Sequence, residues 1–102
     1  MKMKVLKENV YLVKLDKRSG KTFEHFQHRI DIHSATSAIQ FLYWLQTNLG
    51  LGLPWNLYYS VQHRLDFDIP RWTVRYNEPG KAFTQVFVRS DLVPFILLTH
   101  GD

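Results

Sequence analysis

Residues 34–62 read SATSAIQFLYWLQTNLGLGLPWNLYYSVQ, and none of these 29 residues is Asp, Glu, Lys, Arg or His. Charged residues are common elsewhere, since they make up 22% of the whole chain. A helix at a protein surface normally carries charged side chains on its outer face. The uncharged segment is therefore either buried on most of its surface or covered by a partner.

The first half of this segment predicts a helix that ends at about Leu49. Ser34 or Ser37 can cap its start, and Gly50 is a natural stop. The apolar residues at helical spacing predict a buried stripe of Ala35, Ala38, Ile39, Leu42, Leu45 and Leu49, with Phe41 and Trp44 on one flank. The remaining face is polar but neutral and holds Gln40, Tyr43, Gln46 and Thr47.

The second half of the segment is ambiguous, and residues 55–68 fit two patterns. The alternation of Leu57, Tyr59 and Val61 favours a strand. The spacing of Trp55 and Tyr58 would favour a short helix instead. We predict a strand, because aromatic and β-branched residues dominate these positions.

Four further segments have strand-like composition. Residues 10–16 and 22–32 predict a hairpin connected by residues 17–21, in a register that places Leu12 opposite Phe26. Residues 71–76 and 82–88 predict a second pair.

In that second pair, the turn at residues 78–81 places Tyr76 opposite Phe83 and Trp72 opposite Phe87. Residues 90–99 predict a last buried strand or a helical turn, and Pro94 argues against a regular helix there.

These elements predict one α+β domain over residues 1–102. The expected architecture is one main helix packed on a mostly antiparallel sheet, in the order β-β-α-β-β-β. The chain has no Cys, which excludes disulfides and thiol chemistry. It also shows no signal-peptide pattern and no run of about 20 apolar residues. We therefore expect a cytoplasmic protein that does not enter a membrane.

The sequence shows no arrangement of residues that indicates catalysis or a cofactor. Of the five histidines, His25 and His28 are three apart, a spacing that puts them on opposite faces of a strand. The usual spacings of metal ligands are absent. Without a nucleophile, base or phosphate-binding motif, we expect no enzyme, no metal and no cofactor.

A basic charge balance makes nucleic-acid binding one functional hypothesis. The formal net charge is +4, and residues 1–31 alone carry that excess. Basic groups near one sheet or hairpin could contact phosphates. The candidate residues are Arg71, Arg75, Arg89, Lys17, Arg18 and Lys21.

Protein binding is the hypothesis that the uncharged segment favours. Interface centres are poor in charged residues and rich in aromatic ones. The candidate partner-binding residues are Gln40, Tyr43, Trp44, Gln46, Thr47, Trp55, Tyr58 and Tyr59. The partner is another protein or a second copy in a homodimer. By analogy with small basic phage or mobile-element accessory proteins, we expect a non-enzymatic protein that inhibits or modulates a larger host complex.

Overall fold

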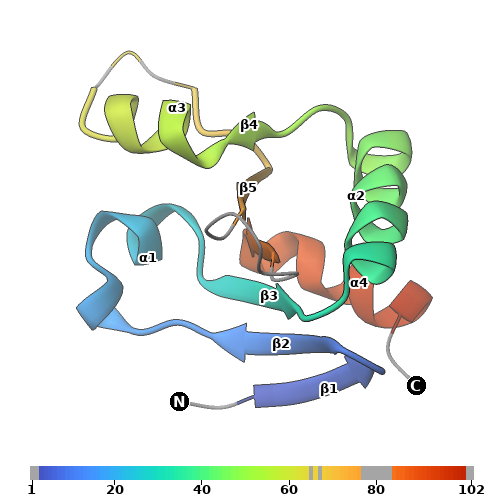
Figure 1. The fold of residues 1–102 in the computed structure, drawn as a ribbon. Coiled ribbons are helices and arrows are strands. Elements are labelled where there is room, and N and C mark those ends of the chain that lie inside the picture. The colour runs from blue at the N-terminus through green and yellow to red at the C-terminus, as the bar shows by residue number, and fades with distance from the viewer. Residues whose placement is uncertain (1–2, 65, 67, 77–83, 101–102) are drawn as a thin grey trace.

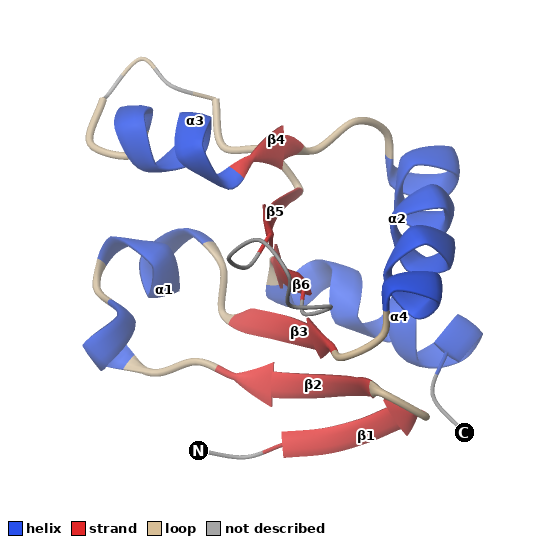
Figure 2. Cartoon of the chain, in the orientation of Figure 1, coloured by secondary structure: helices blue, strands red, loops and turns tan. Residues whose placement is uncertain are grey.

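The computed structural model describes residues 3–64, 66, 68–76 and 84–100, and these form a six-stranded mixed sheet with four α-helices (Figure 1). The strands are β1 (Met3–Lys7), β2 (Val10–Lys14), β3 (His28–Ile32), β4 (Leu53–Pro54), β5 (Trp72–Tyr76) and β6 (Thr84–Val88). The helices are α1 (Lys21–His25), α2 (Ala35–Leu49), α3 (Trp55–Val61) and α4 (Val93–His100), with 3₁₀ turns η1 (Lys17–Ser19) and η2 (Ser90–Leu92) (Figure 2). The predicted α+β class is confirmed.

The strands lie in the order β1-β2-β3-β6-β5-β4. Four neighbouring pairs are antiparallel, and β4 and β5 are parallel. The pairing of β3 with β6 joins the two halves of the chain in one sheet. The expectation of a mostly antiparallel sheet therefore holds, but the predicted element order lacks β1, β4 and three of the helices.

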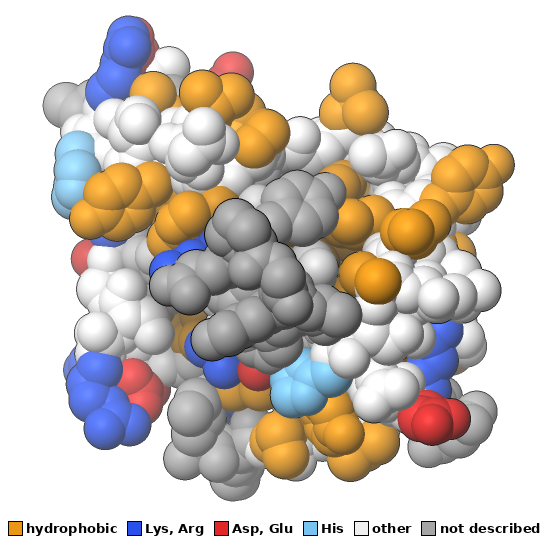
Figure 3. Space-filling view, viewed as in Figure 1, with side chains coloured by type: hydrophobic (Ala, Val, Ile, Leu, Met, Phe, Trp, Pro, Cys, Tyr) orange, Lys and Arg blue, Asp and Glu red, His pale blue; other side chains and the backbone are white. Residues whose placement is uncertain are grey.

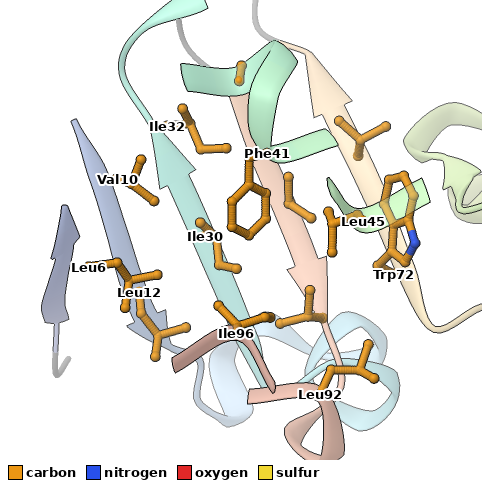
Figure 4. Close-up of a cluster of buried hydrophobic side chains, with 14 residues drawn as sticks. Leu6, Val10, Leu12, Ile30, Ile32, Phe41, Leu45, Trp72, Leu92 and Ile96 are labelled. Atoms are coloured by element: carbon orange, nitrogen blue, oxygen red, sulfur yellow. The ribbon is translucent and has the colours of Figure 1, made fainter. Parts of the chain in front are cut away.

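Helices α2 and α4 cover one face of the sheet, where the larger hydrophobic cluster lies (Figure 4). Because side chains alternate along a strand, every second residue of β2, β3, β5 and β6 points into this cluster. Phe41 of α2 has no exposed surface and lies between Ile30 and Leu45 in Figure 4. The buried members are Leu6, Val10, Leu12, Ile30, Ile32, Ala38, Phe41, Leu45, Trp72, Val74, Val86, Val88, Leu92 and Ile96.

A smaller cluster lies on the opposite face. It consists of Leu15, Phe26, Tyr58 and Phe87. Helix α3 contributes Tyr58, and the end of α1 contributes Phe26. The two faces of the sheet are thus covered by different helices.

Helix α2 has the predicted ends but a different buried face. The Ser34 hydroxyl accepts a hydrogen bond from the Ser37 N–H at 3.3 Å, and Gly50 ends the helix with φ 83°. The buried residues are Ala38, Phe41 and Leu45, whereas Ile39 is 69% exposed and Ala35 is exposed. The prediction of Ile39 and Ala35 as core is wrong, because the sheet and α4 receive the face centred on Phe41.

Two segments predicted as strands contain helices. Residues 21–25 form α1, so the predicted strand over residues 22–32 is correct only from His28 onward. The Asp16 carboxylate accepts the Arg18 N–H at 3.0 Å and starts η1, which ends the hairpin ribbon early. Leu12 consequently pairs with Ile30 rather than with Phe26.

Residues 55–61 form α3, so the strand predicted over residues 55–68 is wrong there. The helical spacing is the pattern that the fold uses. It brings Tyr58 and Gln62 to the buried side of this segment. Burial of Tyr58 in the smaller cluster outweighs the local strand preference of aromatic residues.

The predicted register of β5 and β6 is wrong by one residue. Trp72 pairs with Val88, and Tyr76 pairs with Thr84. A shift of one residue moves side chains to the other face of a sheet. Trp72 and Phe87 therefore lie in different clusters, while Phe83 and the predicted turn at residues 78–81 lie outside the described residues.

The segment predicted over residues 90–99 as a strand or helical turn is η2 followed by α4. Pro94 is the second residue of α4. A proline in the first turn of a helix sacrifices no hydrogen bond, because the N–H groups there have no partner within the helix. The prediction that Pro94 prevents a regular helix is therefore wrong.

Candidate interaction surface

The outer face of α2 is exposed and uncharged. The structure places four of the predicted partner-binding residues on it, namely Gln40, Tyr43, Gln46 and Thr47. Tyr43 is 71% exposed, and Ile39, four residues earlier, lies on the same flank at 69%. Hydrophobic side chains stand over α2 at the right of Figure 3. We give the name α2 face to the five residues Ile39, Gln40, Tyr43, Gln46 and Thr47.

The other predicted partner-binding residues are not continuous with the α2 face. Trp44 is half-buried and packs against the larger cluster. Trp55, Tyr58 and Tyr59 belong to α3, which packs on the opposite face of the sheet and stands apart from α2 in Figure 1. Tyr58 is fully buried and cannot contact a partner. The predicted patch is thus split into two surfaces.

A groove of about 610 Å³ lies beside the α2 face, between α2 and α4. Its volume falls within the range of about 300–1,000 Å³ that is usual for ligand pockets. It is lined by Trp44, Asn48, Leu49, Arg71, Arg89, Asp91, Leu92, Phe95 and Thr99. Sequence reasoning named Arg71, Arg89 and Trp44 but did not join them, because only the fold brings these segments together.

The groove is basic. Arg89 is bound to Asp91, with Nη2 to Oδ2 at 3.0 Å. Arg71 lies in the bend before β5, is exposed, and forms no ion pair with the described residues. The groove therefore combines walls that include Trp44 and Phe95 with the Arg71 guanidinium, which has no ion-pair partner among the described residues.

The six cations proposed for nucleic-acid binding are dispersed, and three of them, Arg18, Lys21 and Arg89, form ion pairs. Arg18 lies 2.7 Å from Asp16, and Lys21 lies 3.0 Å from Glu24. The Arg75 guanidinium stacks over Trp55 at 5.7 Å, on the other side of the sheet from the groove that Arg71 lines. Arg71 and Arg75 therefore do not share one face of the sheet.

A partly buried polar contact lies between α1 and α3. His25 Nδ1 and the Tyr58 hydroxyl share a hydrogen bond of 2.7 Å. Burial raises the pKa of Tyr58 to about 12. Burial and, to a lesser extent, the Lys21 charge lower the pKa of His25. Both groups are therefore neutral at neutral pH, and their contact joins α1 to α3.

Acidification is expected to destabilise the protein in part through His25. A histidine with a lower pKa in the folded than in the unfolded chain binds fewer protons when folded. Its stabilising contribution is complete above the unfolded pKa of about 6.5 and decreases as the pH falls below it. We expect His25→Gln to have a smaller loss of unfolding free energy than wild type between about pH 7 and about pH 5.5. Urea unfolding at both pH values measures this, and an unchanged loss in the variant would contradict it.

His28 should also make the protein less stable as the pH falls, because burial and the Lys14 charge lower its pKa as well. The His25→Gln variant should therefore retain part of the acid sensitivity. The double variant with His28→Gln should retain less.

The described residues include neither a cluster of metal ligands nor a helix that could cross a membrane. In residues 3–64, 66, 68–76 and 84–100, there is no group of three or more His, Asp or Glu residues that could hold a metal ion. Over the same residues, no helix has the length and apolar character needed to cross a membrane.

Comparisons with known proteins add no relative. No protein-family model, no curated protein and no solved structure matches this chain. The assignment of the α2 face and the groove therefore depends on their geometry and chemistry.

Proposed function

We propose that this protein acts by binding another protein through the α2 face and the adjoining groove, without catalysing a reaction. The observation that carries the proposal is the exposure of Ile39 and Tyr43, at 69% and 71%, on a helix without a charged residue. Two large apolar side chains on one exposed flank are suited to the centre of an interface, where charge is scarce and aromatic residues are enriched.

The groove supports the proposal by supplying a specific anchor. A guanidinium beside two aromatic rings is suited to an acidic side chain of the partner, because arginine binds carboxylates through two hydrogen bonds. We therefore propose a partner whose contacting surface carries a carboxylate next to apolar residues. A second copy of this chain is the other occupant that the experiment must distinguish.

The dispersal of the basic residues favours this function over nucleic-acid binding. Phosphate recognition depends on several cations that act together along one surface. Arg18, Lys21 and Arg89 already contact carboxylates. As a proposed role, binding without reaction suits a cytoplasmic accessory protein that inhibits or modulates a larger complex.

Tyr43→Asp is expected to weaken partner binding by at least about tenfold, because it places a charge in an interface centre without a compensating group. The fold should remain intact, since Tyr43 is 71% exposed. The partner is identified by affinity capture from the native cytosol and mass spectrometry. Its affinity for the wild type and the variant is then measured with both proteins purified, by calorimetry.

Tyr59→Asp is the matched control, because Tyr59 is 61% exposed but lies on α3. It should bind as the wild type does. An equal loss of affinity in the two variants, or no loss of affinity in Tyr43→Asp, would contradict the proposed surface. Light scattering distinguishes the homodimer: a wild-type dimer that Tyr43→Asp converts to a monomer identifies the second copy as the occupant.

A further inference from the structure

Strand β1 is an open edge of the sheet. Among the described residues, it pairs with β2 on one side and has no neighbour on the other. The opposite edge, β4, has only two residues, and one of them is Pro54, whose nitrogen carries no hydrogen. Strand β1 has five residues, of which Met3, Lys4 and Val5 pair regularly with β2 before a register shift between Val5 and Lys7. It thus provides the longer row of outward N–H and C=O groups that an additional strand can bind.

The side chains of β1 differ between its two sides. Met3 and Val5 are 63% and 58% exposed, and they pair with Val13 and Tyr11 on the face away from α2 and α4. Hydrophobic side chains are visible over β1 at the lower part of Figure 3. This side of the edge is suited to apolar side chains of an added strand.

The other side of the edge is basic. A hollow of about 300 Å³ is lined by Met3, Lys4, Leu12, Lys14 and His28, none of which is acidic. Lys14 of β2 and His28 of β3 are direct cross-strand partners. Lys4 of β1 pairs with Leu12 of β2. Lys4 and Lys14 are exposed, and neither forms an ion pair with the described residues. Carboxylates of an added strand beside these two lysines would supply the opposite charge.

A second copy of this chain does not suit the edge. The sequence of β1 is MKVLK, with two lysines and no carboxylate. Pairing two such strands would bring four lysines together without an opposite charge, which is unfavourable between neighbouring strands. The two lysines of β1 therefore favour an added strand that carries acidic side chains.

We propose that β1 binds an extended segment of a partner protein as a seventh strand, and that this segment alternates acidic with apolar side chains. The alternation follows from the pleat, since successive side chains point to opposite faces. Acidic side chains lie on the side of Lys4 and Lys14, and apolar side chains contact Met3 and Val5. This surface is separate from the α2 face, so either proposal can fail without the other.

The test uses an acetylated, amidated six-residue peptide in which glutamate alternates with valine. Titrated into ¹⁵N-labelled protein, it should shift the amide resonances of β1 and slow their hydrogen exchange. A peptide with lysine in place of glutamate should shift them far less. Raising the salt concentration should weaken the glutamate complex, because the contacts are near the surface.

Charge reversal provides the second measurement. Lys4→Glu combined with Lys14→Glu should weaken binding of the glutamate peptide by about tenfold or more and strengthen binding of the lysine peptide. Both lysines are exposed, so circular dichroism should show an intact fold. Lys17→Glu, in η1, is the control and should leave β1 binding unchanged. The proposal is overturned if no β1 amide shifts at millimolar peptide, if the shifts lie elsewhere, or if both peptides bind alike.

Discussion

Replacing Phe41 with alanine is expected to lower the free energy of unfolding by about 3–5 kcal/mol, the usual cost of a buried phenylalanine. Phe41 has no exposed surface and packs between α2 and the sheet. Its ring contributes to the main hydrophobic cluster, and alanine would leave a cavity that the surrounding strands cannot close. Chemical denaturation followed by circular dichroism measures the loss.

Ile39→Ala is the control for this prediction, since the sequence alone predicts Ile39 as a core residue. In the structure Ile39 is 69% exposed. Its replacement should change the free energy of unfolding by no more than about 0.5 kcal/mol, as expected for surface positions. A larger loss in Ile39→Ala than in Phe41→Ala would show that α2 presents a different face to the sheet.

Replacing Asp31 with alanine is expected to destabilise the protein by about 2–3 kcal/mol, somewhat below the usual cost of breaking a fully buried ion pair. Arg29 and Asp31 lie two residues apart on β3 and form two hydrogen bonds, at 2.6 Å and 2.9 Å. Their side chains are only 23% and 12% exposed. Removal of the carboxylate leaves the mostly buried Arg29 side chain without its counter-charge.

The chain contains matched controls for Asp31. Arg64 with Asp66 and Arg89 with Asp91 have the same spacing and similar hydrogen bonds, but they are exposed. Asp66→Ala and Asp91→Ala should each cost far less than Asp31→Ala, because exposed ion pairs contribute little. Equal losses in all three variants would show that burial does not determine the contribution of the Arg29 pair.

The parts of the fold that the sequence predicted well have local physical causes. The ends of α2 depend on the Ser34 hydroxyl and on the positive φ of Gly50. Strands β2, β5 and β6 lie within the predicted ranges, because their apolar residues alternate or their β-branched residues dominate.

The errors concern contacts between distant residues. Residues 55–61 are as suited to a strand as to a helix until the smaller cluster receives Tyr58. The register of β5 against β6 depends on which residues face the larger cluster, and the turn chemistry alone placed it one residue away.

The candidate site was predicted in part. The absence of charge from residues 34–62 pointed to a face of α2, and Gln40, Tyr43, Gln46 and Thr47 are exposed there. The aromatic residues Trp55, Tyr58 and Tyr59 belong to the same uncharged segment, but they lie on the other side of the sheet. Composition carries no information on which side of a sheet a helix packs, so the sequence could not separate the two groups.

The sequence by itself determined the α+β class, the limits of α2 and the absence of charge on its outer face, since these properties depend on residues close together in the chain. Only the tertiary structure decided that Phe41 rather than Ile39 is buried, that α2 and α3 cover opposite faces, and that Arg71 and Arg89 line a groove beside Trp44. These outcomes depend on how α2 is rotated over the sheet and which face each helix covers. Packing between residues far apart in the sequence determines both.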